Sequence, residues 1–202
     1  MSSTDHTQSR RSDPPRFGPG DRSVLLAVAR DSIRHGVETG RPLRVHPEDF
    51  PQVLRAPGAS FVTLHRNGRL RGCIGSLEPW RPLVQDVAEN AFAAAFRDPR
   101  FPPLGPEELE DLDIHISVLS APEELEFDSE EDLVRKLQPG RDGLILQDGT
   151  RKGTFLPSVW EELPDPRQFL THLKLKAGLP PDHWSDSLRV WRYGTESFDR
   201  AA

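Results

Sequence analysis

Cys73 is the residue best suited to chemistry in this chain, and it lies in the pentapeptide RGCIG at residues 71–75. A thiol acts as a nucleophile in its thiolate form, which a nearby cation favours. Arg71 stands two positions before Cys73, so both side chains would share one face of a regular strand. Gly72 and Gly75 remove side chains that would crowd a ligand or a second backbone. The pentapeptide therefore predicts an activated thiolate or a tight binding patch, with a buried packing cysteine as the alternative.

The other groups that thiol or metal chemistry needs are sparse. The chain has seven histidines, and none forms a helical HxxxH or HExxH pair. One cysteine excludes an intrachain disulfide, a multi-cysteine zinc site and an iron–sulfur cluster held by this chain alone. We therefore expect no cofactor and no structural metal. His115, on the polar face of a strand, is the candidate partner of Cys73, whereas His65 is predicted on the face opposite Cys73.

The segment SFVTLHRNGRLRGCIG predicts a hairpin over residues 60–75. Asn67-Gly68 is a preferred pair for a two-residue type I′ turn, because both residues tolerate positive φ. With that turn, a regular register places Leu64 opposite Arg71 and Val62 opposite Cys73.

Short elements account for the rest of the chain. Apolar residues at helical spacing, Leu25, Val28, Ala29, Ser32 and Ile33, predict a first helix that begins at Asp21 or Ser23. Strict alternation predicts a half-buried strand over 112–119. Further helices are predicted over 79–97, 129–138 and 166–177, with a second hairpin around Asp148-Gly149 and a strand in SLRVWRY. Hairpins separated by single helices indicate an α+β fold, with a mainly antiparallel sheet and flanking helices.

Composition narrows the class of protein. A length of 202 residues suits one domain, and 20 prolines exclude a coiled coil or a long helical bundle. The net charge of −6 argues against a large nucleic-acid surface. The chain has no apolar run of membrane-spanning length and no signal-peptide core, so we expect a cytoplasmic protein. Residues 1–20 are polar and predict a disordered tail before a domain over 21–198.

An ordered series of motifs resembles a known family. FVTL followed by LRGCIGSLEP resembles the signature of the AMMECR-type domain family, whose prokaryotic members are called AmmeMemoRadiSam system protein A. Further motifs follow in order over roughly residues 21–194: NAFAAAFRDPRFPPL, LDIHISVLS, GLIL, GTFLPSVW and FLTHLKLKAGL. The resemblance implies a larger and a smaller lobe with a cleft between them, and it places Cys73 in that cleft.

The same resemblance implies site residues and partners. By motif position, the residues that accompany Cys73 are Arg71, Gly72, Gly75, Glu78, Asn90, Asp98, Arg100 and Phe101. The implied partners are a MEMO-like protein and a radical-SAM enzyme. This chain departs from the family pattern in two places, with Lys174 where a second cysteine often stands and Ser158 in place of a glutamine. Chemistry that requires two thiols is therefore not expected.

Two hypotheses about function follow. In the first, the protein is an enzyme or enzyme component with Cys73 as nucleophile or covalent carrier. Arg71 then stabilises the thiolate, while Glu78, Asp98 and Arg100 position a substrate or relay protons. In the second, the protein is a non-catalytic adaptor or ligand-binding subunit, and RGCIG is structural. The exposure of the Cys73 sulfur and its distance from a base distinguish the two.

Overall fold

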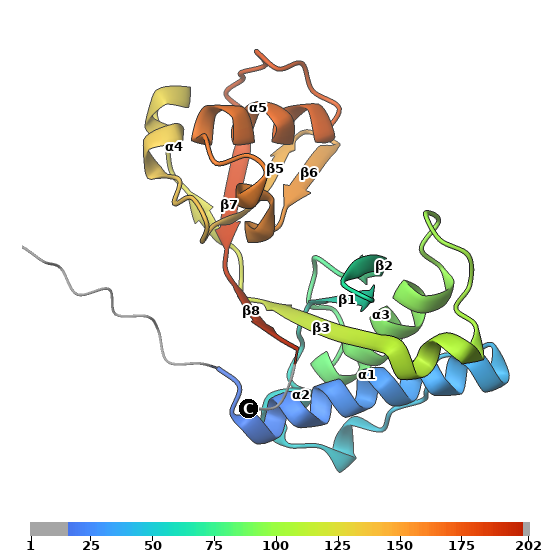
Figure 1. Ribbon diagram of the computed structural model, residues 1–202. Coiled ribbons are helices and arrows are strands. Elements are labelled where there is room, and N and C mark those ends of the chain that lie inside the picture. Colours follow the sequence, from blue (N-terminus) through green and yellow to red (C-terminus); the bar gives the residue numbers. More distant parts are fainter. Residues whose placement is uncertain (1–15, 200–202) are drawn as a thin grey trace, which may run out of the picture.

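The protein has two lobes joined by a narrow neck (Figure 1). The computed structural model describes residues 16–199. The larger lobe contains α1 (Pro19–Thr39), η1 (Pro47–Asp49), α2 (Gln52–Arg55), β1 (Ser60–Arg66), β2 (Arg69–Gly75), α3 (Leu83–Phe96), η2 (Pro106–Asp111), β3 (Leu112–Leu119) and β8 (Thr195–Phe198). The smaller lobe contains β4 (Glu123–Leu125), α4 (Glu130–Lys136), β5 (Gly143–Asp148), β6 (Arg151–Phe155), η3 (Pro157–Glu161), α5 (Pro166–Lys176) and β7 (Arg189–Tyr193).

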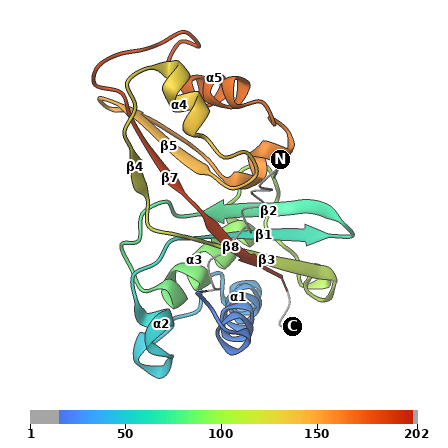
Figure 2. The same cartoon turned by 90° about the vertical axis from the view of Figure 1, so that its left-hand side faces the viewer.

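The larger lobe is an antiparallel sheet with helices on one face. Its strand order is β2-β1-β3-β8. Figure 2 shows α1 and α3 on one side of this sheet and the smaller lobe on the other. Val62, Leu64 and Ile116 point to the helical side and are fully buried. The hydroxyl of Ser32 on α1 donates to the Ala88 carbonyl of α3 over 2.7 Å, which fixes the two helices side by side.

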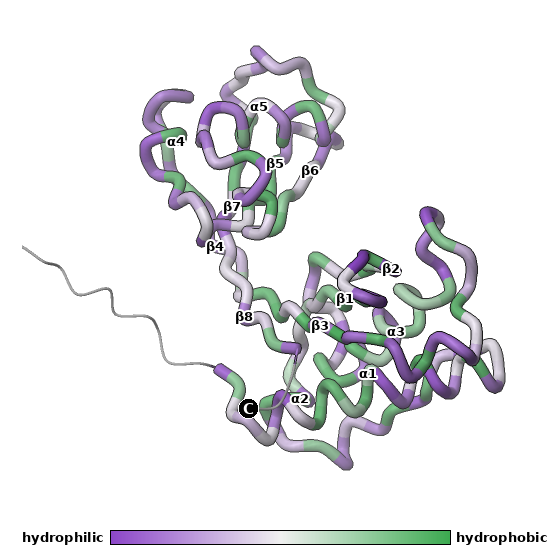
Figure 3. Tube along the Cα trace, in the orientation of Figure 1, coloured by the Kyte–Doolittle hydropathy of each residue, from purple (hydrophilic) through white to green (hydrophobic). Residues whose placement is uncertain are grey.

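The smaller lobe has a second antiparallel sheet, with strand order β4-β7-β5-β6. Its core packs α4 and α5 against that sheet, and Phe169 of α5 stacks on the Trp160 ring with 3.7 Å between ring centroids. Buried apolar residues form a cluster within each lobe, and Figure 3 shows hydrophobic segments along the chain in both lobes. Each lobe therefore has its own hydrophobic core.

The lobes are held together by apolar contacts at the neck and by an ion pair between Lys152 and Glu78. The chain crosses the neck between β3 and β4 and returns between β7 and β8 (Figure 2). Ala59 and Leu119 of the larger lobe pack with Ile145 and Tyr193 of the smaller lobe.

Within residues 16–199, no helix is long and apolar enough to cross a membrane.

The α+β class and most of the expected elements are confirmed. All five residues of the predicted stripe on the first helix are buried. The first hairpin turns at Asn67 (φ 51°) and Gly68 (φ 72°), as a type I′ turn requires. The second helix begins at Leu83 rather than Pro79. The short elements α2, β4 and β8 were not predicted, because stretches of three or four residues carry too little periodicity.

The predicted boundary between tail and domain is wrong for residues 16–20. Phe17 is only 1% exposed and packs in the larger core, and α1 already begins at Pro19. The backbone N–H groups of Arg16 and Phe17 donate to the Glu196 carboxylate, at 2.8 and 3.3 Å. These contacts come from the other end of the chain, so the local polarity of the tail could not predict them. The rest of the predicted tail, residues 1–15, lies outside the described residues.

Candidate functional site

The strand that carries RGCIG pairs with β1 in a register that differs from the predicted one. Leu64 pairs with Gly72 and His65 pairs with Leu70, so Arg71 is an extra residue in a β-bulge. Beyond the bulge every partner shifts by one position, and Cys73 lies opposite Thr63 rather than Val62. The prediction failed because it assumed an unbroken ladder from the turn.

The bulge changes which side chains share a face with Cys73. Thr63 pairs with Cys73 on one side and with His115 on the other, so the three residues form one row across β2, β1 and β3. His65 lies on this same face, with its ring centroid 4.9 Å from that of His115. The expectation that His65 and Cys73 occupy opposite faces is therefore wrong.

The Cys73 sulfur has a hydroxyl neighbour and, among the residues that the structure describes, no acid–base partner. Cys73 is half-buried, and its Sγ lies 3.2 Å from Thr63 Oγ1. Within residues 16–199 no imidazole or carboxylate hydrogen-bonds to the sulfur. His115 is two strands away from Cys73, which corresponds to roughly 10 Å between Cα atoms. Its Nδ1 faces the carboxylate of Asp199 at 3.7 Å.

Asp98 and Arg100 bind the backbone of Cys73 at the open edge of β2. The Cys73 N–H donates to Asp98 Oδ2 over 2.9 Å, and Arg100 donates to the Cys73 carbonyl over 3.5 Å. Arg100 also donates from Nε and Nη2 to the two Asp98 oxygens, at 3.0 and 2.7 Å. The Arg100 guanidinium, with the N–H groups of Cys73 and Arg100, holds the pKa of Asp98 well below its ordinary value despite burial. Asp98 and Arg100 therefore make the backbone hydrogen bonds to Cys73 that a neighbouring strand would otherwise make.

Arg71 binds a different carboxylate, that of Glu108. Its guanidinium donates from Nε and Nη2 to the two oxygens of Glu108 on η2, both at 2.8 Å. Arg66 adds a bond of 3.2 Å to the same carboxylate, and Gly105 N–H adds one of 3.0 Å. The Arg71 guanidinium, chiefly, lowers the pKa of Glu108 to about 2 although burial opposes the shift. Arg71 therefore fastens the bulge to η2 and makes no hydrogen bond with Cys73.

This cluster predicts a pH-dependent contribution to stability. A carboxyl whose pKa is lowered by folding stabilises the protein above its unfolded pKa, and loses that effect as pH falls toward the folded value. For Glu108 the window runs from pH 4.5 down to about 2, and the full contribution is of the order of 3 kcal/mol. We expect Glu108→Gln to lower the free energy of unfolding by about that amount at pH 7 in urea titrations.

The loss in Glu108→Gln should shrink as the pH is lowered from 4.5 to 3, because wild-type Glu108 is then being protonated. Glu110→Gln, on the same short helix and exposed, is the control and should match wild type. A Glu108→Gln loss that stays constant across this pH range would contradict the assignment.

The two glycines of the motif permit close packing inside the larger lobe. A Cβ on Gly72 would lie 2.1 Å from the Ala94 carbonyl oxygen of α3. A Cβ on Gly75 would lie 2.3 Å from the Phe61 ring. Both glycines therefore bring the strand against neighbouring atoms of the fold.

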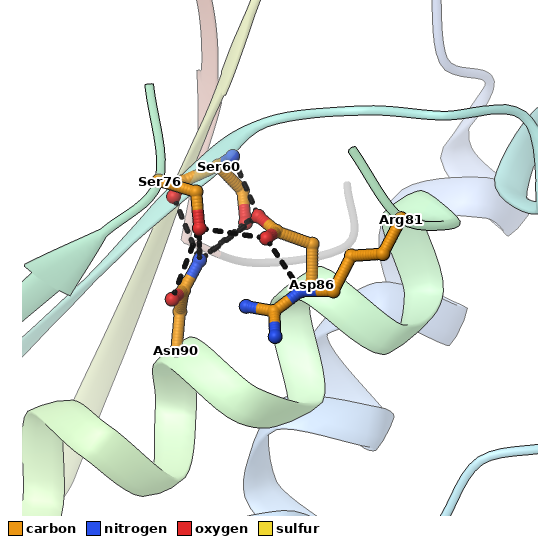
Figure 4. A network of polar contacts seen from close by, with 5 residues as sticks. All are labelled: Ser60, Ser76, Arg81, Asp86 and Asn90. Carbon is orange, nitrogen blue, oxygen red and sulfur yellow. Dashed lines mark hydrogen bonds and ion pairs between the residues drawn. The ribbon is translucent and has the colours of Figure 1, made fainter. Parts of the chain in front are cut away.

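Asn90 belongs to a buried polar network rather than to the surroundings of Cys73 (Figure 4). Its amide donates to Asp86 Oδ2 and to the Ser60 carbonyl, at 2.8 and 2.9 Å. Asp86 is fully buried and also accepts from the Ser60 N–H and hydroxyl, from Ser76 and from Arg81, all within 2.9 Å. The network fastens α3 to the start of β1 and to the segment after β2. Asp86 was missed because a single acidic residue on an apolar helix carries no motif.

The remaining expected residues lie apart from the sulfur. Glu78 is exposed and bonds Lys152 of β6 across the lobes at 2.9 Å, and this contact lowers the Glu78 pKa. The Arg100 guanidinium lies over the Phe101 ring, 5.5 Å from its centroid. Of the predicted set, only Asp98 and Arg100 contact Cys73 through hydrogen bonds.

A cavity of about 1020 Å³ lies between the lobes. Val118 and Leu119 line it from β3, whereas Asp142 and Arg192 line it from the smaller lobe. Neither Cys73 nor any other expected site residue lines this cavity. The cavity lies where the resemblance implies a cleft, but Cys73 is not among the residues that line it. The two sites are separate because Cys73 lies on the strand at the far edge of the larger sheet.

The fold and site define a class of two-lobed α+β proteins with one antiparallel sheet in each lobe and a glycine-flanked cysteine on an edge strand. The sequence profile of the AMMECR1 family matches residues 26–198, and the chain belongs to that family. A protein of Methanothermobacter thermautotrophicus is 44% identical over 177 residues, covering 87% of this chain and 92% of its own length. A protein of Methanopyrus kandleri is 40% identical over 184 residues, covering 87% of this chain and 86% of its own length.

A solved structure shares the architecture. The crystal structure of an uncharacterised protein from Pyrococcus horikoshii superposes with a TM-score of 0.76 at 39% sequence identity. The match covers 86% of this chain and 88% of that protein. The two-lobed arrangement is thus shared with a relative of known structure.

Proposed function

We propose that the protein is a non-catalytic adaptor or ligand-binding component of a cytoplasmic system that includes a MEMO-like protein and a radical-SAM enzyme. The partners are those implied by the resemblance to AmmeMemoRadiSam system protein A, and membership of the AMMECR1 family supports that resemblance. The observation that carries the non-catalytic role is the surroundings of the Cys73 sulfur. Thr63 is its hydrogen-bond partner, and among the described residues no base is positioned to take its proton.

The rest of the RGCIG motif supports the same proposal. Arg71 is bound to Glu108, Gly72 packs on the Ala94 carbonyl, and Gly75 packs on the Phe61 ring. The backbone N–H of Cys73 is bound to Asp98. Internal contacts thus occupy the groups that a catalytic role would need free to meet a substrate.

A reactive thiol is the second candidate, and one observation favours it. Cys73, Thr63 and His115 form a row across three strands, and Asp199 faces His115. The Thr63 hydroxyl is close enough to donate to a thiolate, and the Arg100 guanidinium bonds the Cys73 carbonyl. In this candidate role Cys73 is the nucleophile and His115 acts through Thr63.

Alkylation of native protein by iodoacetamide at pH 7 separates the two candidates. For an adaptor we expect Cys73 to react at least tenfold more slowly than glutathione, because the side chain is half-buried and has no base partner. Arg100→Gln, which removes the guanidinium bonded to the Cys73 carbonyl, should change that rate less than twofold. His172→Gln, an exposed histidine on α5, is the control. A native rate above that of glutathione that falls in both Arg100→Gln and His115→Gln would overturn the adaptor assignment.

Reconstitution tests the partners. The tagged protein should co-purify with the MEMO-like protein, with the radical-SAM enzyme, or with both, when these are expressed together. Cys73→Ser should retain the complex and support the same turnover by the radical-SAM partner within twofold. Failure of both partners to co-purify would reject the adaptor role. An intact complex that loses turnover in Cys73→Ser would replace that role with the reactive thiol.

A further inference from the structure

The cavity between the lobes is lined by three arginines, Arg16, Arg141 and Arg192. Arg192 lies on β7 and Arg141 lies just before β5, and both line the cavity. Arg192 forms a long ion pair with Asp142, whose Oδ2 is 3.9 Å from Nη1, beyond hydrogen-bond distance. In the described part of the chain, the Arg141 side chain makes no hydrogen bond or ion pair. Arg192 thus has no hydrogen-bonded carboxylate among the described residues, so both guanidiniums keep donors that can bind an anion.

The acidic residues on the same wall do not satisfy these donors. Glu196 is already bound by the Arg22 guanidinium at 2.9 Å and by two backbone N–H groups. Asp142 accepts from the Gln138 N–H over 2.8 Å and is 5% exposed. Burial raises the pKa of Asp142, although the charges of Arg192 and Arg141 oppose the shift. Glu123 lies opposite Arg192 in the sheet, and within residues 16–199 it forms no ion pair.

The volume and the other lining residues of the cavity indicate the size and chemical character of a ligand. The volume of about 1020 Å³ is that of a pocket for a metabolite-sized molecule rather than for a lone ion. Val118, Leu119 and Pro157 supply an apolar surface on the walls. Because the walls come from both lobes, a ligand in the cavity would contact each of them.

We propose that this cavity binds a small organic anion, whose carboxylate or phosphate group bridges Arg141 and Arg192. The apolar part of the ligand contacts Val118 and Leu119, while Asp142 accepts a hydrogen bond from a hydroxyl or ammonium group beside the anion. The inference deepens the ligand-binding role proposed above and rests on it. It assigns that role to the cavity rather than to the RGCIG strand.

Titration with citrate and with inorganic pyrophosphate at constant ionic strength tests the site. Calorimetry on the full chain should give saturable binding of at least one probe. Binding of citrate alone would identify a carboxylate ligand, and binding of pyrophosphate alone would identify a phosphate ligand. The double variant Arg141→Gln/Arg192→Gln should weaken binding at least tenfold. Arg189→Gln is the matched control, because Arg189 lies on the same strand but is bound to Glu124 outside the cavity, and its affinity should equal that of wild type.

A direct readout in the wild-type protein keeps the proposal testable if the double variant fails to fold. The backbone amide signals of Gly140 and Gly194, which line the cavity, should shift on titration, whereas that of Gly68 at the hairpin turn should not. Absence of saturable binding, or equal binding by wild type and a folded double variant, would overturn the anion site. Neither result bears on thiol alkylation or co-purification, so the two proposals can fail separately.

Discussion

Gly72→Ala is expected to destabilise the larger lobe severely. The new Cβ would lie 2.1 Å from the Ala94 oxygen and 3.0 Å from the Ala94 carbonyl carbon. These are backbone atoms of α3, so no side chain can rotate away, and β2 or α3 must move. Overpacking of this kind costs about 3 kcal/mol or more. For a protein of this size we expect the melting temperature to fall by about 6–12 °C in a calorimetric scan.

Gly20→Ala is the matched control for Gly72→Ala. Gly20 lies in the first turn of α1, and nothing lies within 4 Å of a Cβ built there. Alanine has the higher helix propensity, so this variant should melt at the wild-type temperature or slightly above it. If Gly72→Ala also melted like wild type, the close approach of β2 to α3 would be wrong. The interpretation of RGCIG as a structural motif would then be wrong as well.

Removal of the Asp86 carboxylate is expected to destabilise the protein at least as much as Gly72→Ala does. Five donors point at this fully buried group, from Ser60, Ser76, Arg81 and Asn90. Asp86→Ala removes this acceptor from all five, including the Arg81 guanidinium, although the Asn90 amide keeps the Ser60 carbonyl. Breaking a buried ion pair from one side costs about 3–5 kcal/mol. The free energy of unfolding from urea titration should fall by that amount.

Two further variants sharpen the Asp86 test. Asp86→Asn keeps the shape but replaces one acceptor with a donor, so it should still be clearly destabilised. Asp31→Ala on α1 is the control, because Asp31 is exposed and bonds only Arg34 among the described residues. A loss in Asp86→Ala no greater than that in Asp31→Ala would show that the network of Figure 4 does not stabilise the fold.

The Gly72 and Asp86 variants also bear on function. If Gly72 and the Asp86 network act on stability, then the segment around RGCIG is a rigid support for the edge strand. The exposed guanidinium of Arg100 and the half-buried thiol of Cys73 are then the groups of that segment left to meet a partner. The cavity near Arg192, which Cys73 does not line, is the separate place proposed for a small ligand.

Local sequence determined much of the fold. Asn67-Gly68 specified the hairpin turn because two adjacent residues had to accept positive φ, and the structure has that turn. The alternation of residues 112–119 and the apolar stripe of the first helix specified which faces are buried. Ser129 and Asp165 cap the helices that their spacing predicted. In each case the information lies within a few residues of the element it determines.

Tertiary structure decided the site. The bulge at Arg71 depends on Glu108, which is 37 residues away, and it moved Cys73 from Val62 to Thr63. The bond from Cys73 to Asp98 and the burial of Phe17 against the opposite end of the chain likewise join distant residues. The cavity at Arg141 and Arg192 exists only where two lobes meet. Turn chemistry and periodicity act between chain neighbours, whereas these contacts depend on how whole elements pack, and no local pattern specifies that packing.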